Sequence, residues 1–366
     1  MEPVGDGHGG IVTYLVEMRF LKSLIIVGAA TSLAACSAAV SAPDGGSGSG
    51  LGDTAVVATS PLTGLPEMAP TPVLIVKLDN TRNAQPHAGL KYADVVYLEE
   101  VEYGITRLAA VFSSTIPTRI GPTRSARITD IDLTAQYGNP AFAFSGVQRK
   151  MWPAINDSTV VDVSPNKYAA AYFRDHDRKM PYNLFLNGTK SLTWATGVSS
   201  DRNIGFVFSS DIPQGGLTNT GATMKWSEAS AEFTYDPVSG LYKVSLNGIP
   251  AQAAEDTSGQ NAATVIIQDV VQTQSKYWDK GGGNTPHATT IGSGTATVLR
   301  DGRSFSVNWN RPTSDSGTTF TMADGSPMPF KPGQQWVVLL NAKTPATLLP
   351  QPSPAPSTSK KAPTAI

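Results

Sequence analysis

Cysteine is almost absent from this chain of 366 residues, in which Cys36 is the only one. A single cysteine excludes an intramolecular disulfide, so packing alone must stabilise the fold. An excess of positive charge is also lacking, because the formal net charge is -1, and this argues against nucleic acid as a partner. The four histidines stand far apart, and the chain has no Walker-type glycine loop and no clustered Cys and His spacing. We therefore expect no metal site and no cofactor.

Long apolar runs are missing as well, apart from one near the N-terminus. Residues 24–35 form a run of 12 apolar or small residues behind Arg19 and Lys22, which is typical of a secretory signal and too short to span a bilayer comfortably. The run ends in LAAC, which resembles the bacterial lipobox that is cut before a lipidated cysteine. We predict lipidation of Cys36 and an outward-facing, lipid-anchored location at a bacterial cell membrane. An incidental cysteine is the alternative.

Composition divides the chain into six segments. The stretch before the signal, MEPVGDGHGGIVTYLVE, is interpreted as a start codon assigned too early. Gly and Ser after Cys36 predict a tether, and Pro, Ser and Thr at the far end predict a disordered tail. The predicted segments are an extension (1–17), a signal peptide (18–35), a tether (36–60), a mixed α/β domain (61–225), a β-rich domain (226–345) and a tail (346–366).

Apolar runs and turn residues predict the elements of the folded part. In its first half, VLIVKLDN at 73–80 and two runs that flank Gly104 predict strands, and Thr129 is expected to cap a short helix that stops at Gly138. Further strands are expected at 140–146, 158–164 and 205–210, and a short helix at 190–196. The second half consists of strand runs, with a hairpin predicted at Asp301-Gly302. The predicted fold class is α+β, a mixed α/β N-terminal domain followed by an antiparallel β-rich C-terminal domain.

Several segments carry a family resemblance. VKLDNTRNAQPHAGLKYADVVYLEEVEYGITRLAAVFSS, GPTRSARITDIDL, YFRDHDRKMPYNLF and IGSGTATVLRDGRSFSVNWNRP resemble, in this order, the YerB-like predicted lipoproteins of bacteria. The likeness covers residues 60 to 341. It implies an envelope lipoprotein with two domains of unknown function and brings no established reaction. The family pattern has a histidine after the proline of RKMPYNLF, where this chain has Tyr182, and a phenol does not titrate near neutral pH as a histidine does.

Arginines of the first half form the favoured site hypothesis. The segment RIGPTRSARITDIDL joins a Gly-Pro bend to three of them, and the planar guanidinium suits a carboxylate or a phosphate. The alternative is that Asp130 and Asp132 pair with these arginines at the surface, where such pairs stabilise little. The candidate ligand-binding residues are Arg107, Arg119, Arg124, Arg127, Arg174 and Arg178.

Carboxylates offer a second, catalytic hypothesis. Two of them could act as acid and base, as in glycoside hydrolases. Strand alternation predicts Glu100 and Glu102 on one face and Glu99 with Tyr97 on the other, and an ordinary solvated strand face is the alternative. The candidate acid or base residues are Glu99, Glu100, Glu102 and Asp130.

Other side chains carry weaker expectations. His87 and His176 are expected in exposed loops, and FSGVQ lacks the pattern of a nucleophile elbow. Tryptophans of the second half could stack on sugar rings, although such residues more often fill a core. We expect Trp309 and Trp336 in the core and Trp278 at the surface.

The favoured function is therefore a binding module. Its ligand would be an anionic cell-wall component or a wall-assembly protein, held at the membrane by the lipid on Cys36. The alternative is a hydrolase or lyase that acts on peptidoglycan or a related glycan. A solute-binding lipoprotein is disfavoured, because such proteins use two similar α/β lobes and the second half here is β-rich.

Overall fold

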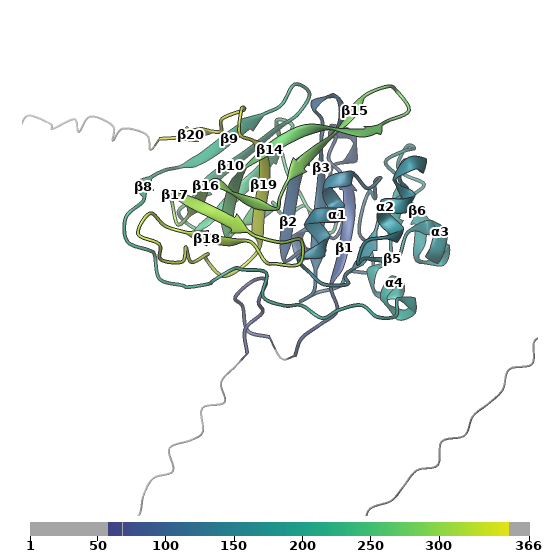
Figure 1. Cartoon of the computed structure of the whole chain (residues 1–366), viewed down its shortest axis with the longest axis horizontal. Helices are drawn as coiled ribbons and strands as arrows, with labels where there is room; N and C mark the ends of the chain where they lie inside the picture. Colours follow the sequence, from purple (N-terminus) through teal and green to yellow (C-terminus); the bar gives the residue numbers. More distant parts are fainter. Residues whose placement is uncertain (1–57, 68, 351–366) are drawn as a thin grey trace, which may run out of the picture. The chain divides into compact units, whose positions relative to one another are not determined.

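Strands dominate the computed structural model, which describes residues 58–67 and 69–350 (Figure 1). The described strands form sheets of twelve, six and two strands. The predicted extension, signal peptide, lipidated Cys36 and most of the tether and tail lie outside the described residues. No described helix is long and apolar enough to cross a membrane. The α+β class is confirmed, with a mixed first half and a β-rich second half.

The first half contributes five strands to the large sheet. The predicted pair around Gly104 is confirmed as an antiparallel hairpin, whose second strand also pairs with the run at 73–80. Two short strands continue the sheet in parallel. These strands are β1 (Leu74–Asp79), β2 (Val95–Glu100), β3 (Thr106–Phe112), β4 (Ala141–Ala143) and β5 (Val161–Asp162).

The second half contributes the rest of the large sheet. The predicted hairpin at Asp301-Gly302 is confirmed, with φ of 50° and 69° at the two residues, as a tight hairpin turn requires. The other strands of this half pair antiparallel with their neighbours, except for the strand at residues 335–341, which is parallel to both of its neighbours. These strands are β8 (Leu217–Thr218), β14 (Thr264–Trp278), β15 (Asn284–Thr289), β16 (Gly292–Arg300), β17 (Arg303–Arg311), β18 (Thr319–Thr321) and β19 (Gln335–Asn341).

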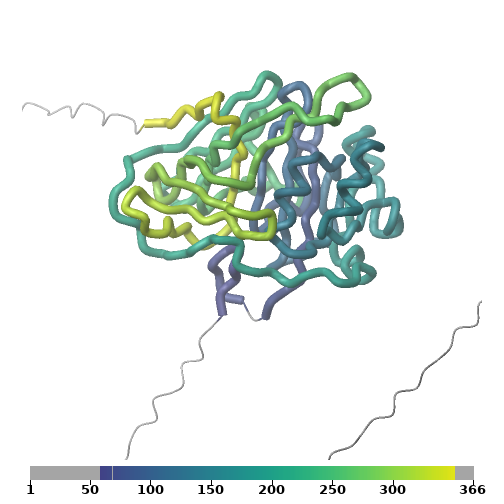
Figure 2. The backbone as a smooth tube through the Cα atoms, in the orientation of Figure 1, coloured from purple at the N-terminus to yellow at the C-terminus, as the bar shows by residue number. Residues whose placement is uncertain are grey.

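Strand β19 joins the two halves. It lies between β2 and β14 and is parallel to both, so that Val338 stands between Leu98 and Ile267. Figure 2 shows this yellow segment running between the purple and green strands. Its first six residues are all buried, because both faces of the sheet are covered here, and this explains the unbroken apolar run WVVLL.

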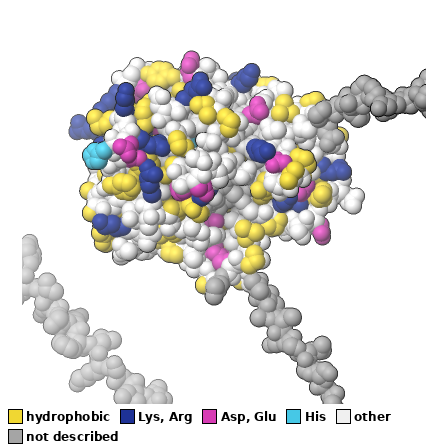
Figure 3. Space-filling model, turned by 180° about the vertical axis from the view of Figure 1, so that it is seen from behind, with side chains coloured by type: hydrophobic (Ala, Val, Ile, Leu, Met, Phe, Trp, Pro, Cys, Tyr) yellow, Lys and Arg dark blue, Asp and Glu magenta, His cyan; other side chains and the backbone are white. Residues whose placement is uncertain are grey.

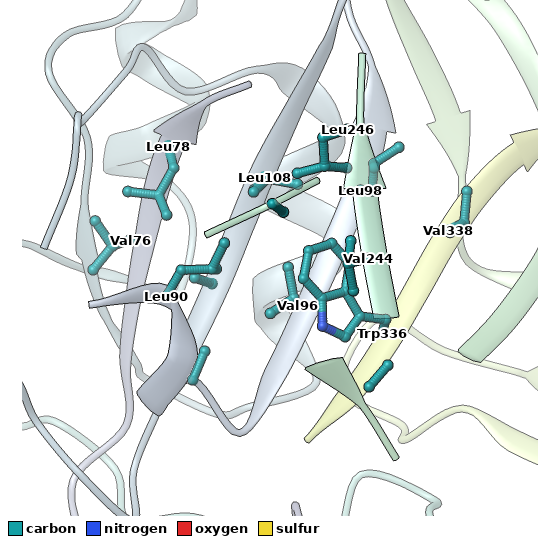
Figure 4. Close-up of a cluster of buried hydrophobic side chains, with 14 of the residues drawn as sticks. Val76, Leu78, Leu90, Val96, Leu98, Leu108, Val244, Leu246, Trp336 and Val338 are labelled. Atoms are coloured by element: carbon teal, nitrogen blue, oxygen red, sulfur yellow. The ribbon is translucent and has the colours of Figure 1, made fainter. Parts of the chain in front are cut away.

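The six-stranded sheet covers one face of the large sheet. Trp336 is fully buried and lies edge-on to Phe233, with ring centroids 5.5 Å apart. Figure 4 shows its indole among side chains of β2 and of the covering sheet, including Val96 and Val244. The covering strands are β9 (Gly221–Lys225), β10 (Ser230–Asp236), β11 (Leu241–Leu246), β12 (Ile249–Pro250), β13 (Asn261–Ala262) and β20 (Thr347–Leu349). The predicted domain boundary at 225/226 falls in the turn between β9 and β10.

Helices cover part of the opposite face. Leu133 and Tyr137 pack there with Val95, Tyr97 and other residues of a second core cluster. The helices are α1 (Ile128–Ala135), α2 (Trp152–Asn156), α3 (Pro165–Tyr168) and α4 (Gly188–Trp194), with short 3-10 turns η1 (Arg82–Ala84), η2 (Leu90–Tyr92), η3 (Glu102–Gly104), η4 (Arg149–Met151) and η5 (Ala169–Ala171). The two-stranded sheet is β6 (Tyr172–Arg174) with β7 (Leu184–Leu186).

Two local predictions were wrong. Arg127, not Thr129, is the N-cap of α1, because the Asp130 carboxylate accepts the backbone N–H of Arg127 at 2.6 Å, while the Thr129 hydroxyl accepts from Ala288 instead. Residues 205–210 form no strand, and only a single bridge joins Phe208 to Phe330 there. The expectations for tryptophan are confirmed, with Trp309 and Trp336 buried and Trp278 49% exposed.

Trp336→Ala tests the role of β19. Removing a fully buried indole leaves a cavity at the junction of the halves, so the free energy of unfolding should fall by about 3–5 kcal/mol. Trp278→Ala is the control and should cost less than about 1 kcal/mol, because that side chain is half exposed. Urea unfolding followed by circular dichroism measures both. Equal, small losses would contradict the packing described for Trp336.

Candidate functional site

Charged side chains meet at one end of the central strands. Pairing places Asp79 of β1, Arg107 of β3 and Glu99 of β2 in one row across the sheet. Alternation puts this row on the face that α1 covers, together with Tyr97, as predicted for Glu99. All three charged residues are buried. Each therefore needs a partner of opposite charge.

Lys77 lies on the same face of the sheet, one row away from these three charged residues. It stands beside Ala109, whose small side chain leaves room for the lysine stem. The Lys77 ammonium contacts Glu99 and also donates to Asp130 of α1 at 2.7 Å. None of these three side chains is more than 2% exposed. The lysine thus ties two strands and the helix together inside the core.

The arginine segment ahead of α1 surrounds the same row. Arg124 lies 2.7 Å from Asp79, and Arg127 donates to Glu102. Arg107 donates to the backbone oxygen of Ser125 at 2.6 Å. Lys77, Arg107, Arg124 and Arg127 thus face Asp79, Glu99, Glu102 and Asp130. The positive and negative charges balance, which leaves little field to attract an anion from solution.

Burial shifts the pKa values within this charged cluster. Burial, and then the charge of Asp130, raise the pKa of Glu99 against the opposing effect of Lys77. Burial and the charge of Arg127 lower the pKa of Arg107 to about 9. Burial alone would raise the pKa of Glu102, but the hydrogen bond and charge of Arg127 outweigh it and hold the pKa below its ordinary value. The geometry is that of a structural ion-pair network.

The carboxylate candidates are only partly brought together. Glu99 and Asp130 share Lys77. Glu102 does not lie on one strand face with Glu100, as alternation had predicted, because β2 ends at Glu100 and the chain turns into η3. Glu102 contacts Arg127, while burial raises the pKa of the partly buried Glu100.

A second group of arginines lies around the β6–β7 hairpin. Arg119 and Arg178 both lie over the ring of Phe185, with guanidinium carbons 4.7 and 5.3 Å from its centroid. Asp175 lies 2.5 Å from Arg119 and 3.6 Å from Arg178. Arg174 is exposed and donates to the Asn183 amide oxygen at 2.7 Å. This group keeps exposed guanidinium surface, whereas Arg107 and Arg127 of the first group are largely buried.

A cavity of about 450 Å³ opens beside these arginines. Asp177, Arg178 and Lys179 line this cavity, while Arg119, Arg174 and Asp175 belong to the adjoining β6–β7 region. Together these six residues carry four positive and two negative charges, hence +2. Seen from behind (Figure 3), Lys and Arg side chains gather at the end of the molecule that carries β6, interspersed with Asp and Glu. The lining residues are Asn83, Gln85, Pro86, Asp177, Arg178, Lys179 and Tyr182. We call Arg119, Arg174, Arg178 and Lys179 the basic patch.

The predicted surface partners of the arginines differ from those observed. Asp130 pairs with Lys77, and Asp132 lies 2.8 Å from His287. The side chains that actually pair with the arginines, Asp79, Glu102 and Asp175, were not predicted. The role of Lys77 was missed too, although a lysine within the apolar run VLIVKLD was a usable signal, since a buried lysine requires carboxylate partners.

The histidines are only partly as expected. His176 is exposed, but His87 is buried, and its Nε2 lies 2.7 Å from the Asp79 carbonyl oxygen. Burial lowers the pKa of His87. Within residues 58–67 and 69–350, no group of three or more His, Cys, Asp or Glu side chains is placed to hold a metal ion.

Comparison with known proteins agrees with this architecture. Residues 62–199 match the model "Protein of unknown function (DUF3048) N-terminal domain", and residues 222–337 match the corresponding C-terminal domain. The chain belongs to this YerB-like family. It is 24% identical over 309 residues to "Putative lipoprotein YerB" of Bacillus subtilis, covering 78% of this chain and 87% of that protein.

A solved structure of the family shares the fold. The crystal structure of the YerB protein from Bacillus subtilis superposes with a TM-score of 0.68 at 18% identity, over 80% of this chain and 99% of that one. The resemblance found in the sequence is therefore confirmed. The name of that relative describes it as a lipoprotein.

Lys77→Met tests the buried ion-pair network. It leaves Glu99 and Asp130 without their cation, so the free energy of unfolding should fall by about 3–5 kcal/mol near neutral pH. A carboxylate whose folded-state pKa is raised contributes stability below its unfolded pKa, and this is lost as the pH rises through the folded pKa. The loss should therefore be larger at about pH 8 than at about pH 5, where Glu99 can take up a proton.

Lys91→Met is the matched control. Lys91 pairs with Asp256 at 2.6 Å, but the two side chains are 21% and 51% exposed. Its replacement should cost less than about 1 kcal/mol at either pH. Urea titrations at both pH values measure the two variants. A loss for Lys77→Met that is small, or equal at both pH values, would show that the lysine does not neutralise these carboxylates.

Proposed function

We propose that this YerB-like protein is an envelope-anchored binding module for an anionic cell-wall component, which it contacts through the basic patch. The observation that carries the proposal is the net charge of +2 that the basic patch has together with Asp175 and Asp177, beside an open cavity of about 450 Å³. Cavities of this size are typical of ligand sites. Arginine supports this ligand class because its planar fork of donors matches a carboxylate or a phosphate.

The patch is organised before any ligand binds. The Phe185 ring orients Arg119 and Arg178, and the backbone oxygens of Ala84 and Pro86 accept hydrogen bonds from Arg178. The Arg119 side chain is still 40% exposed, so part of its donor set remains open to solvent. Fixed donors lose little conformational entropy on binding. Because the patch is exposed, its attraction for an anion should weaken with added salt.

The catalytic alternative has less support from the geometry. Glu99, Glu102 and Asp130 are at most 3% exposed and are held in ion pairs with Lys77 or Arg127. A substrate would have to displace these pairs to reach a carboxylate. The geometry therefore favours binding over hydrolysis. Lipidation of Cys36 would place the module at the membrane surface, facing the wall.

Arg174→Gln with Lys179→Gln tests the proposal. Both side chains are exposed, so the double variant should fold normally while the patch loses two positive charges. In the predicted mature chain, residues 36–366 with Cys36→Ser, we expect pelleting with intact sacculi at low salt. The double variant should pellet about tenfold more weakly, as expected when two charged contacts are lost.

Arg149→Gln with Lys150→Gln is the matched control. These two exposed residues belong to η4 in the same half of the chain, so the loss of charge is identical. Its pelleting should stay within about twofold of the unmodified chain, because charges outside the patch contribute little once screened. Equal pelleting of the two double variants would contradict the patch as the contact. Release of soluble wall fragments would instead support the hydrolase or lyase.

A further inference from the structure

A second cavity lies where loops of both family domains meet. It measures about 470 Å³. The first half supplies Asn80, Thr81, Arg82, Ile105 and Thr106, and the second half supplies residues 225–230, from the β9–β10 hairpin, and Asn247. We call this cavity the junction cleft. Neither the predicted arginine site nor the basic patch includes any of its residues.

Half of the twelve residues that line the junction cleft carry a hydroxyl or amide side chain. Small-molecule sites are usually lined by apolar side chains with a few polar groups. Here polar residues are more numerous than usual, since only Ile105, Trp226 and Ala229 of the lining residues are apolar. The charged residues Arg82, Lys225 and Glu228 are exposed, and none forms an ion pair with another residue of the described ranges. This lining suits a ligand that is itself rich in hydroxyl groups.

Trp226 supplies the one aromatic surface of the cleft. It is partly buried, packs against the core cluster beneath the six-stranded sheet, and also forms part of the cleft wall. An aromatic ring offers a flat apolar surface beside polar groups. The C–H face of a sugar ring matches such a surface, while its hydroxyls match the surrounding amides and hydroxyls.

Hydrogen bonds between the two halves preform the cleft. Asn247 donates to the Asn80 carbonyl oxygen at 2.5 Å, and within the first half the Asn80 amide donates to the Thr106 hydroxyl at 2.8 Å. The Glu228 backbone N–H donates to the Gly104 carbonyl at 3.2 Å. Gly104 has φ of 69°, and a side chain there would collide with Ser227. The turn of β9–β10 is thus fixed against the β2–β3 connection, so little reorganisation is needed on binding.

We propose that the junction cleft is a carbohydrate-binding site, in which a sugar ring stacks on Trp226 and its hydroxyls bond to polar groups of both halves. The segment 80–86 lines this cleft at Asn80–Arg82 and the basic-patch cavity at Asn83, Gln85 and Pro86. A glycan and an anionic group could therefore be bound on the two sides of one segment. The carbohydrate site nevertheless rests on its own residues and does not require the basic patch.

Neutral oligosaccharides test this site, because they cannot report on the basic patch. The probes are chitotetraose, cellotetraose and maltotetraose at about 5 mM, a concentration at which a millimolar complex is populated. Calorimetry on the predicted mature chain with Cys36→Ser should detect at least one of them. Trp226→Ala should weaken that binding about tenfold, as expected for loss of an aromatic contact. Absence of binding to all three probes would overturn the proposal.

Two further variants keep the result interpretable. Trp278→Ala removes an exposed tryptophan of the same half and should bind as the unmodified chain does. Ser227→Tyr adds bulk at an exposed residue of the cleft, at the cost of the hydrogen bond from the Ser227 hydroxyl to the Tyr103 carbonyl, and it should also abolish binding. Circular dichroism verifies folding of each variant. Unchanged binding by a folded Ser227→Tyr or Trp226→Ala protein would refute the site. The Arg174→Gln/Lys179→Gln variant changes only the basic patch and should bind the neutral sugars normally.

Discussion

The insertion of β19 between β2 and β14 is the constraint on which the rest of the structure depends. Without it, both strands would present unpaired edges, which proteins normally cover or blunt. Because β19 is parallel to both neighbours, it must start at the end of the sheet where β2 and β14 also start. The chain therefore has to cross back to that end before β19 begins. Trp336 then fills the space between the two sheets. At the junction cleft, loops of the two family domains are joined directly, by hydrogen bonds from Asn247 to Asn80 and from Glu228 to Gly104.

The buried charges explain why the arginine segment is not simply a ligand site. Lys77, Glu99 and Asp130 bind α1 to the sheet, and Arg127 holds η3 through Glu102. Breaking one partner of such a cluster is costly even where the intact cluster adds little net stability. The arginines around Phe185 are different, because the Arg119 side chain stays 40% exposed and Arg178 lines a cavity. Burial and ion pairing separate the structural arginines from the exposed ones.

Local patterns predicted much of this fold. The hairpins at Gly104 and Asp301-Gly302 were predictable because turn chemistry and flanking strands act over a few residues. The burial of Trp309 and Trp336 followed from their strand runs. The pairing of β19 with β2 was not predictable, since it joins residues far apart in sequence. The partners of Arg124 and Arg127 were missed for the same reason, and Glu102 was misplaced because nothing in the alternation indicated that β2 ends at Glu100.

Native-state hydrogen exchange tests most directly the claim that both family domains share one sheet. The amides of β2, β14 and β19 are the ones to compare, because β19 bonds to both neighbours. Strands that open only by global unfolding exchange with the free energy of the whole molecule. The structure predicts that all three strands exchange with this same free energy and respond equally to denaturant. Exchange of β2 through a separate, lower-energy opening that leaves β14 protected would contradict it.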